Sequence, residues 1–138
     1  MDGNYDTRYA SIDEGTAWPW LEVQLANRGL VQDVRIFDRQ DHKDYCGGRL
    51  KYAEIRVGES RLPLNHRGPI SIKQRYYLCG RYSGSAWDGK AVRFSCGVPR
   101  YAEYVTVQLM IHEKENTILS LQEIEIYGKG IRYIILSD

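Results

Sequence analysis

The chain has 138 residues, enough for one domain with a real core, and 43% of them are apolar, which excludes a disordered tail. Its formal net charge of +1, from 19 basic and 18 acidic side chains, gives no strong field that would favour nucleic acid or an anionic membrane. No apolar run approaches the roughly 20 residues that span a bilayer, so we expect no membrane insertion. The chain opens on a polar turn and not on a signal peptide, which indicates a mature fragment or an excised piece.

The first segment is a tight turn rich in oxygen atoms, with Asp2, Asn4 and Thr7 close together and Ser11 soon after. Calcium takes six to eight oxygen ligands from carboxylates, carbonyls and hydroxyls. If a sheet brings the two ends of the chain together, this turn can share one such cation with the acidic entrance of the last strand. The alternative is an ordinary Asx turn with no metal.

Strand patterns dominate the rest of the chain. Short runs alternate between apolar and polar residues and are separated by Gly, Asn, Asp and Pro, as in antiparallel sheets with one buried face. Helical periodicity is absent over any long window, so the pattern favours an all-β sandwich or barrel. The expected strands are Trp20–Leu25, Val31–Phe37, Ile55–Val57, Ala91–Cys96, Tyr104–Leu109 and Ile124–Tyr127.

The last ten residues include a further apolar, β-branched run, Ile131–Leu136. An exposed strand of this kind would be an aggregation hazard. We therefore expect residues 129–138 to form an extra C-terminal strand that is paired.

Three cysteines, Cys46, Cys79 and Cys96, allow at most one internal disulfide. Cys79 and Cys96 flank a glycine-containing segment that is typical of a wide hairpin loop, so we expect them to be bonded. The alternative is three buried free thiols in a cytosolic protein. The cysteines lack the C-x-x-C spacing of zinc and redox sites.

The chain also lacks the common catalytic motifs, namely the Gly-x-Ser-x-Gly elbow, His-Glu-x-x-His and the phosphate-binding loop. We therefore expect a binding module and not an enzyme.

The ordered succession of motifs resembles discoidin domains, also called coagulation-factor F5/8 type C domains. The opening turn and Trp18–Leu25 resemble the first turn and next strand of these domains, and Leu119–Gly128 resembles their last strand. Arg39-x-Asp41, then Arg49 before the strand Glu54–Gly58, is similar to the fucose-binding F-type lectin branch. The resemblance covers residues 2–128 in order.

This resemblance implies a single domain over residues 1–138, folded as an eight-stranded jelly-roll β-sandwich of the galactose-binding-domain-like type. Family members begin with a further strand, so the first strand is expected to be missing here. The family also implies secretion or display on the cell surface, recognition of glycans or glycoproteins by loops at one end, and a structural calcium ion. Carried over from the family, the metal ligands are Asp2, Asn4, Thr7, Ser11, Gln122 and Glu123.

A sugar presents hydroxyls and one apolar face, so its site needs rigid donors beside a hydrophobic wall. Arginine suits the first role because its guanidinium holds several N–H groups in a fixed fork. The resemblance assigns this role to Arg39 and Arg49, with Asp41 orienting one of them. The alternative is a solvated loop whose ion pairs are worth no more than about 1 kcal/mol each.

The chain departs from the fucose-binding pattern in three ways. Arg39 and Arg49 are ten residues apart, whereas the corresponding arginines of the relatives are seven apart. Relatives bond two adjacent cysteines, of which only Cys46 remains, and they use a histidine from an earlier loop, where residues 11–18 have none. We therefore expect glycan binding without the usual fucose-binding triad, with His42 as the substitute histidine and Trp18, Trp87 and Tyr45 as the candidate stacking faces.

A second loop, Gly80–Gly89, contains Arg81 and Tyr82 as well as Trp87. It can border the same binding face, or alternatively carry a contact with a partner. The rival interpretation is a structural module that uses this fold for protein–protein assembly with other chains and binds no sugar.

Overall fold

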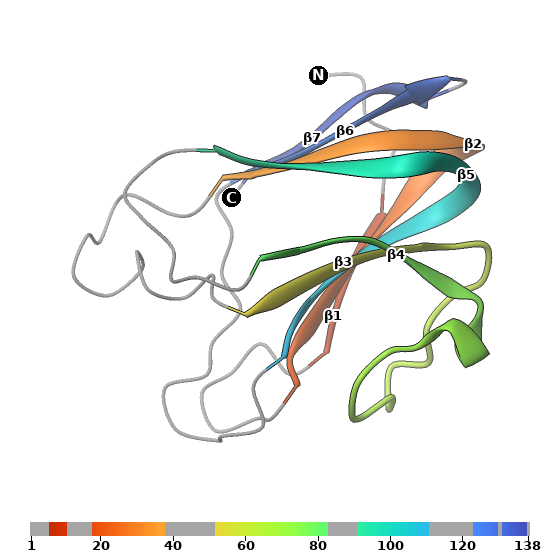
Figure 1. Ribbon diagram of the computed structural model, residues 1–138. Coiled ribbons are helices and arrows are strands. Elements are labelled where there is room, and N and C mark those ends of the chain that lie inside the picture. The colour runs from red at the N-terminus through yellow and green to blue at the C-terminus, as the bar shows by residue number, and fades with distance from the viewer. Residues whose placement is uncertain are drawn as a thin grey trace.

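The computed structural model describes residues 6–10, 18–37, 52–82, 91–110, 123–129 and 131–137 (Figure 1). Within these ranges the chain forms one 3₁₀ turn and seven strands, against the eight predicted for the whole domain. No helix in the described ranges is long and apolar enough to cross a bilayer. The elements are β1 (Asp6–Ala10), β2 (Trp20–Phe37), β3 (Ala53–Gly58), η1 (Ile72–Gln74), β4 (Tyr76–Tyr82), β5 (Ala91–Leu109), β6 (Glu123–Lys129) and β7 (Ile131–Ser137).

Two long strands run through both layers of an antiparallel sandwich (Figure 1). β2 and β5, of 18 and 19 residues, pair with each other on both sides of a sharp bend. One layer contains β6, β7 and one half of each long strand. The other contains β1, β3, β4 and the remaining halves. The predicted all-β sandwich is therefore confirmed.

The prediction of separate strands on either side of the bend is wrong. Trp20–Leu25 and Val31–Phe37 belong to β2, and Ala91–Cys96 and Tyr104–Leu109 belong to β5. In β2 the alternation is interrupted by the exposed residues 26–28, where the register with β5 also shifts. The sequence pattern breaks at the bend because no sheet face is buried there, although the backbone remains extended.

The core lies between the layers. Because successive side chains in a strand point to opposite faces, Leu21 and Val23 face inward from one half of β2, and Val34 and Ile36 from the other. They pack with apolar side chains of β3, β5 and β6 in one continuous cluster. Each such burial stabilises the fold by roughly 1.5–3 kcal/mol, so this cluster is the main force that holds the layers together.

The two ends of the chain share a partner strand. β5 occupies one edge of β2, while β1 pairs with the first half of the other edge and β6 pairs with its second half. β7 pairs in turn with β6, which confirms that the apolar run Ile131–Leu136 is a paired strand.

A disulfide joins Cys79 of β4 to Cys96 of β5, as predicted. β4 is the last strand of its layer, and Cys96 lies in the half of β5 that belongs to the other layer. The bond therefore fastens the two layers together at one open side of the sandwich. Closing a loop with this sequence separation of 17 stabilises the fold by about 3 kcal/mol on the loop-entropy model.

Candidate functional site

The outer face of β3 carries charged residues where its inner face carries the core. Ala53, Ile55 and Val57 point into the apolar cluster, so Glu54 and Arg56 point outward by alternation. Strand register places Glu54 directly opposite Arg81 of β4 on one side and Gln108 of β5 on the other. A polar row therefore crosses three strands on the outer surface.

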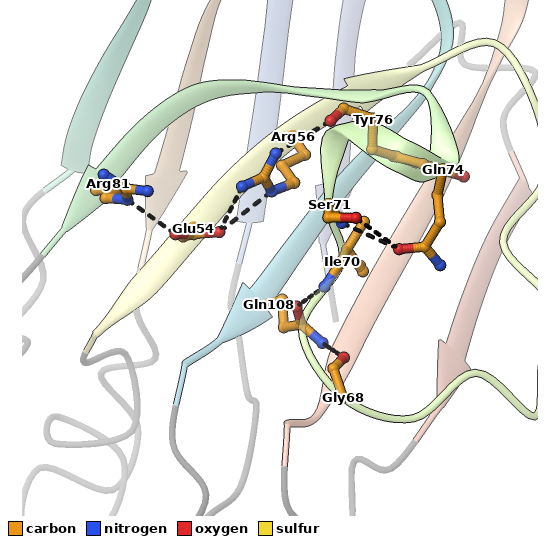
Figure 2. A network of polar contacts seen from close by, with 9 residues as sticks. All are labelled: Glu54, Arg56, Gly68, Ile70, Ser71, Gln74, Tyr76, Arg81 and Gln108. Atoms are coloured by element: carbon orange, nitrogen blue, oxygen red, sulfur yellow. Dashed lines mark hydrogen bonds and ion pairs between the residues drawn. The ribbon is translucent and has the colours of Figure 1, made fainter.

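Glu54 holds two guanidinium groups at once. Its Oε2 accepts a hydrogen bond from Arg81 Nε at 2.8 Å, and its Oε1 accepts one from Arg56 Nε at 3.1 Å. The same Oε1 forms an ion pair with Arg56 Nη2, also at 3.1 Å. Arg56 also donates from Nη1 to the Tyr76 carbonyl oxygen at 3.0 Å. Figure 2 shows Arg81, Glu54 and Arg56 in one row that ends at Tyr76. The Glu54 and Arg56 side chains are only 9% and 13% exposed, and buried charges of this kind require such pairing.

Arg81 differs from Arg56 in its exposure. Its side chain is 65% exposed, and Glu54 is its carboxylate partner. Within the part of the chain that the structure describes, its Nη1 and Nη2 atoms have no hydrogen-bond partner. The contact with Glu54 restrains the guanidinium at Nε while the outer N–H groups stay accessible. This is the arrangement of a rigid, planar donor that can bind a ligand.

A pocket of about 260 Å³ lies beside this donor. Its lining residues Tyr52 and Tyr82 lie where β3 begins and β4 ends. Figure 1 shows these two strand ends side by side at one end of the sheet. Tyr52, which is 55% exposed, and Tyr82 provide apolar aromatic surface, while Arg81 and Glu54 provide polar atoms. A small pocket with apolar walls and a few converging polar groups is the usual form of a ligand site. Its lining residues are Tyr52, Ala53, Glu54, Arg81, Tyr82 and Met110.

A further group of hydrogen bonds, centred on Gln108, stabilises the outer face next to the pocket. Gln108 Oε1 accepts from the Ile70 backbone N–H at 2.9 Å, and its Nε2 donates to the Gly68 carbonyl oxygen at 3.0 Å (Figure 2). Nε2 also donates to the Trp18 carbonyl oxygen at 3.1 Å. One side chain of β5 therefore fastens both the segment before β2 and the segment before η1. These two segments therefore cover the polar row at Gln108, next to Glu54.

A buried carboxylate, Glu22, anchors the same covering segment further along the sheet. Glu22 Oε2 accepts from the Leu62 backbone N–H at 3.1 Å and from the Tyr76 hydroxyl at 2.6 Å, and that hydroxyl also contacts the Ser60 carbonyl oxygen. Burial, and then the neighbouring Glu22 carboxylate, raise the pKa of Tyr76 well above its ordinary value. The phenol therefore stays protonated and donates to Glu22.

Most of the residues predicted for a ligand site lie outside the described residues. Trp18 is described: it is half-buried, with a left-handed φ of 58°, and its carbonyl oxygen is held by Gln108. Its stacking role stays a prediction. The residues outside the described ranges are Arg39, Asp41, His42, Tyr45, Arg49 and Trp87. These six residues belong to the ranges 38–51 and 83–90. In the sequence, the pocket residues Tyr52 and Tyr82 directly adjoin these two ranges.

The predicted calcium ligands stay predictions as well. The backbone of Thr7 pairs with Val23 in one half of β2, and that of Glu123 pairs with Phe37 at the end of the other half. The remaining four, Asp2, Asn4, Ser11 and Gln122, lie outside the described residues.

Sequence reasoning identified only part of the pocket. Arg81 and Tyr82 were expected to border the binding face, but Tyr52 and Glu54 had no predicted role. The charges at Glu54 and Arg56, two residues apart on one strand, are a visible pattern. Their partner across the sheet depends on the register between β3 and β4, which includes a shift between Ile55 and Arg56.

Comparison with known proteins gives one family match. The model of a family described as a NedA-like, galactose-binding domain of F5/8 type C matches residues 1–107. No curated protein sequence matches the chain.

Several solved structures share the fold. A fucolectin from striped bass (Morone saxatilis) serum aligns with a TM-score of 0.63 and 24% identity over 91% of this chain, and the match spans 36% of that lectin chain. A fucose-binding module from Streptococcus pneumoniae aligns with a TM-score of 0.55 and 19% identity, covering 91% of this chain and 70% of that one. The lectin domain of lectinolysin, solved with Lewis b antigen, aligns with a TM-score of 0.59 and 17% identity, covering 94% and 95%. At these identities the matches establish the fold.

Proposed function

Because this chain belongs to the F5/8 type C family described as the NedA-like, galactose-binding domain, we propose that it is an extracellular, non-catalytic module that binds glycans. The observation that carries the proposal is the pocket in which Arg81, oriented by Glu54, lies beside Tyr52 and Tyr82. The names of the similar structures support it, since they describe a fucolectin, a fucose-binding module and a lectin domain bound to Lewis b.

The pocket contains the two kinds of surface that a sugar ring requires. The exposed face of Tyr52 can cover the apolar face of a pyranose, while Nη1 and Nη2 of Arg81 donate to its hydroxyls. Glu54 already restricts the Arg81 side chain, so little further rotamer entropy is lost when the sugar binds. Arg39, Asp41, His42, Arg49 and Trp87 complete the proposed site from the adjoining loops.

Arg81→Ala is expected to weaken glycan binding by about 5- to 150-fold, because it removes two hydrogen bonds worth about 0.5–1.5 kcal/mol each. A glycan array first identifies a bound sugar, and isothermal titration then measures its Kd. Arg93→Ala is the matched control, since Arg93 is also exposed (60%) and paired with a carboxylate, Asp33, but lies on the other layer. An array without bound glycans, or equal Kd values for Arg81→Ala and the intact protein, would contradict the proposal.

We also propose a structural calcium ion bound by the two ends of the chain. Support comes from the oxygen-rich turn at Asp2 and from the carboxylate of Glu123 in the last family motif. At calcium 100-fold above its Kd, binding adds about 2.7 kcal/mol to the free energy of unfolding. We therefore expect a chelator to lower the Tm and excess calcium to restore it. Glu123→Ala is expected to have the lowered Tm without any response to chelator, whereas an unchanged Tm of the intact protein in chelator would exclude the site.

A further inference from the structure

The charges along the polar row do not cancel. Two guanidinium groups, Arg56 and Arg81, share the single carboxylate of Glu54. Arg56 contacts it through two nitrogen atoms and is nearly buried, so it neutralises that carboxylate within the protein. Arg81 contacts the same carboxylate through one nitrogen atom and extends to the surface. One positive charge is therefore left over, and it lies on the wall of the pocket.

The guanidinium edge of Arg81 that does not contact Glu54 has a defined geometry. Nε is used by Glu54, and the edge formed by Nη1 and Nη2 has no partner in the described part of the chain. Two parallel N–H groups on one edge of a guanidinium match the two oxygens of a carboxylate or a sulfate. Figure 2 shows Arg81 at the outer end of the row, beyond Glu54.

We infer that this pocket prefers an acidic sugar, whose carboxylate or sulfate binds Arg81 while its ring lies against Tyr52. The inference rests on the proposed glycan-binding function and adds the chemical class of the ligand. A neutral sugar can still bind, through ordinary hydrogen bonds to the same donor. Hydrogen bonds between charged groups are about twice as strong as neutral ones, so the acidic sugar is expected to bind about tenfold more tightly.

Salt dependence provides an independent test of the same charge. Arg81 is mostly exposed, and the Debye length falls from about 8 Å at 0.15 M salt to about 3 Å at 1 M. The preference for the acidic sugar therefore shrinks at high salt. Binding of the neutral sugar, which has no net charge, changes little.

The experiment compares three sugars that differ at one carbon atom: galactose, galacturonate and galactose 6-sulfate. The Kd of each is measured by titration calorimetry or ligand-observed NMR at 0.15 M and 1 M salt. We expect the two acids to bind about tenfold more tightly than galactose at low salt, with most of that difference lost at high salt. Because galacturonate tests the carboxylate and galactose 6-sulfate tests the sulfate, tighter binding of only one of them shows which anion Arg81 prefers.

Two variants separate charge from shape. Arg81→Gln keeps a planar donor without charge, so it is expected to abolish the acid preference while still binding galactose. Arg81→Lys keeps the charge without the fork, so part of the preference and all of its salt dependence are expected to remain. Arg93→Ala is again the control and is expected to behave as the intact protein does.

The possible failures are distinguishable. If galactose binds as tightly as both acids, or if the acid preference survives in Arg81→Gln, the inference is wrong and the proposed glycan-binding function stands. If none of the three sugars binds and an array yields no glycan, both are wrong.

Discussion

Replacing Glu54 with alanine is expected to lower the free energy of unfolding by about 3–5 kcal/mol, the usual cost of removing one partner of a buried ion pair. Arg56 would remain nearly buried, and among the described residues the Tyr76 carbonyl oxygen would be its one remaining partner, so desolvation of its charge would no longer be offset. Chemical unfolding of the purified domain, followed by circular dichroism, measures the change.

The matched control is Asp33→Ala, which breaks the more exposed pair with Arg93 and should cost no more than about 1 kcal/mol. Glu54→Gln should fall between the two, because the amide keeps an acceptor without the charge. A Glu54→Ala protein within about 1 kcal/mol of the intact domain would show that solvent already screens the row. Glu54→Ala should also weaken glycan binding, since Arg81 loses the contact that orients it.

Gly128→Ala is expected to destabilise the fold by more than about 3 kcal/mol, the upper end of the usual range for overpacked cores. A Cβ atom at this position would overlap the Leu30 carbonyl oxygen and would lie only 2.7 Å from the carbonyl carbon. Both are backbone atoms of β2, so no side-chain rotation can relieve the overlap, and β2 and β6 must separate.

Gly97→Ala serves as the comparison for that substitution. Gly97 has a φ of +74°, and a methyl group added there would meet nothing within 4 Å, so only backbone strain of about 1–2 kcal/mol is expected. Chemical unfolding of both variants gives the difference, and hydrogen exchange of the β2–β6 amides locates it. If Gly128→Ala were no less stable than Gly97→Ala, the close approach of β2 and β6 at this point would be wrong.

The agreement between sequence and structure is best where the physics is local. Alternation in Trp20–Leu25 and Tyr104–Leu109 identified which residues enter the core, because the two faces of a strand alternate whatever its partner is. The family was identified in the same way, from motifs that occur in order along the chain. The Cys79–Cys96 bond followed from cysteine number and the turn residues between them.

The prediction of strand boundaries failed where one strand passes through both layers of the sandwich. The exposed residues 26–28 interrupt the pattern of β2, and an interruption in alternation looks the same whether the chain turns back or bends and continues. Only the pairing with β5 on both sides of the bend distinguishes the two cases.

The amino-acid sequence by itself determined that this protein is an all-β domain of the F5/8 type C family, and it determined which side of each strand is apolar. Only the tertiary structure decided that Glu54 lies between Arg56 and Arg81. It also decided that Glu54 and Arg81 line a pocket together with Tyr52 and Tyr82. The reason is that side-chain alternation depends on neighbours in the chain, whereas Glu54 and Arg81 are separated by 27 positions and meet through strand register alone.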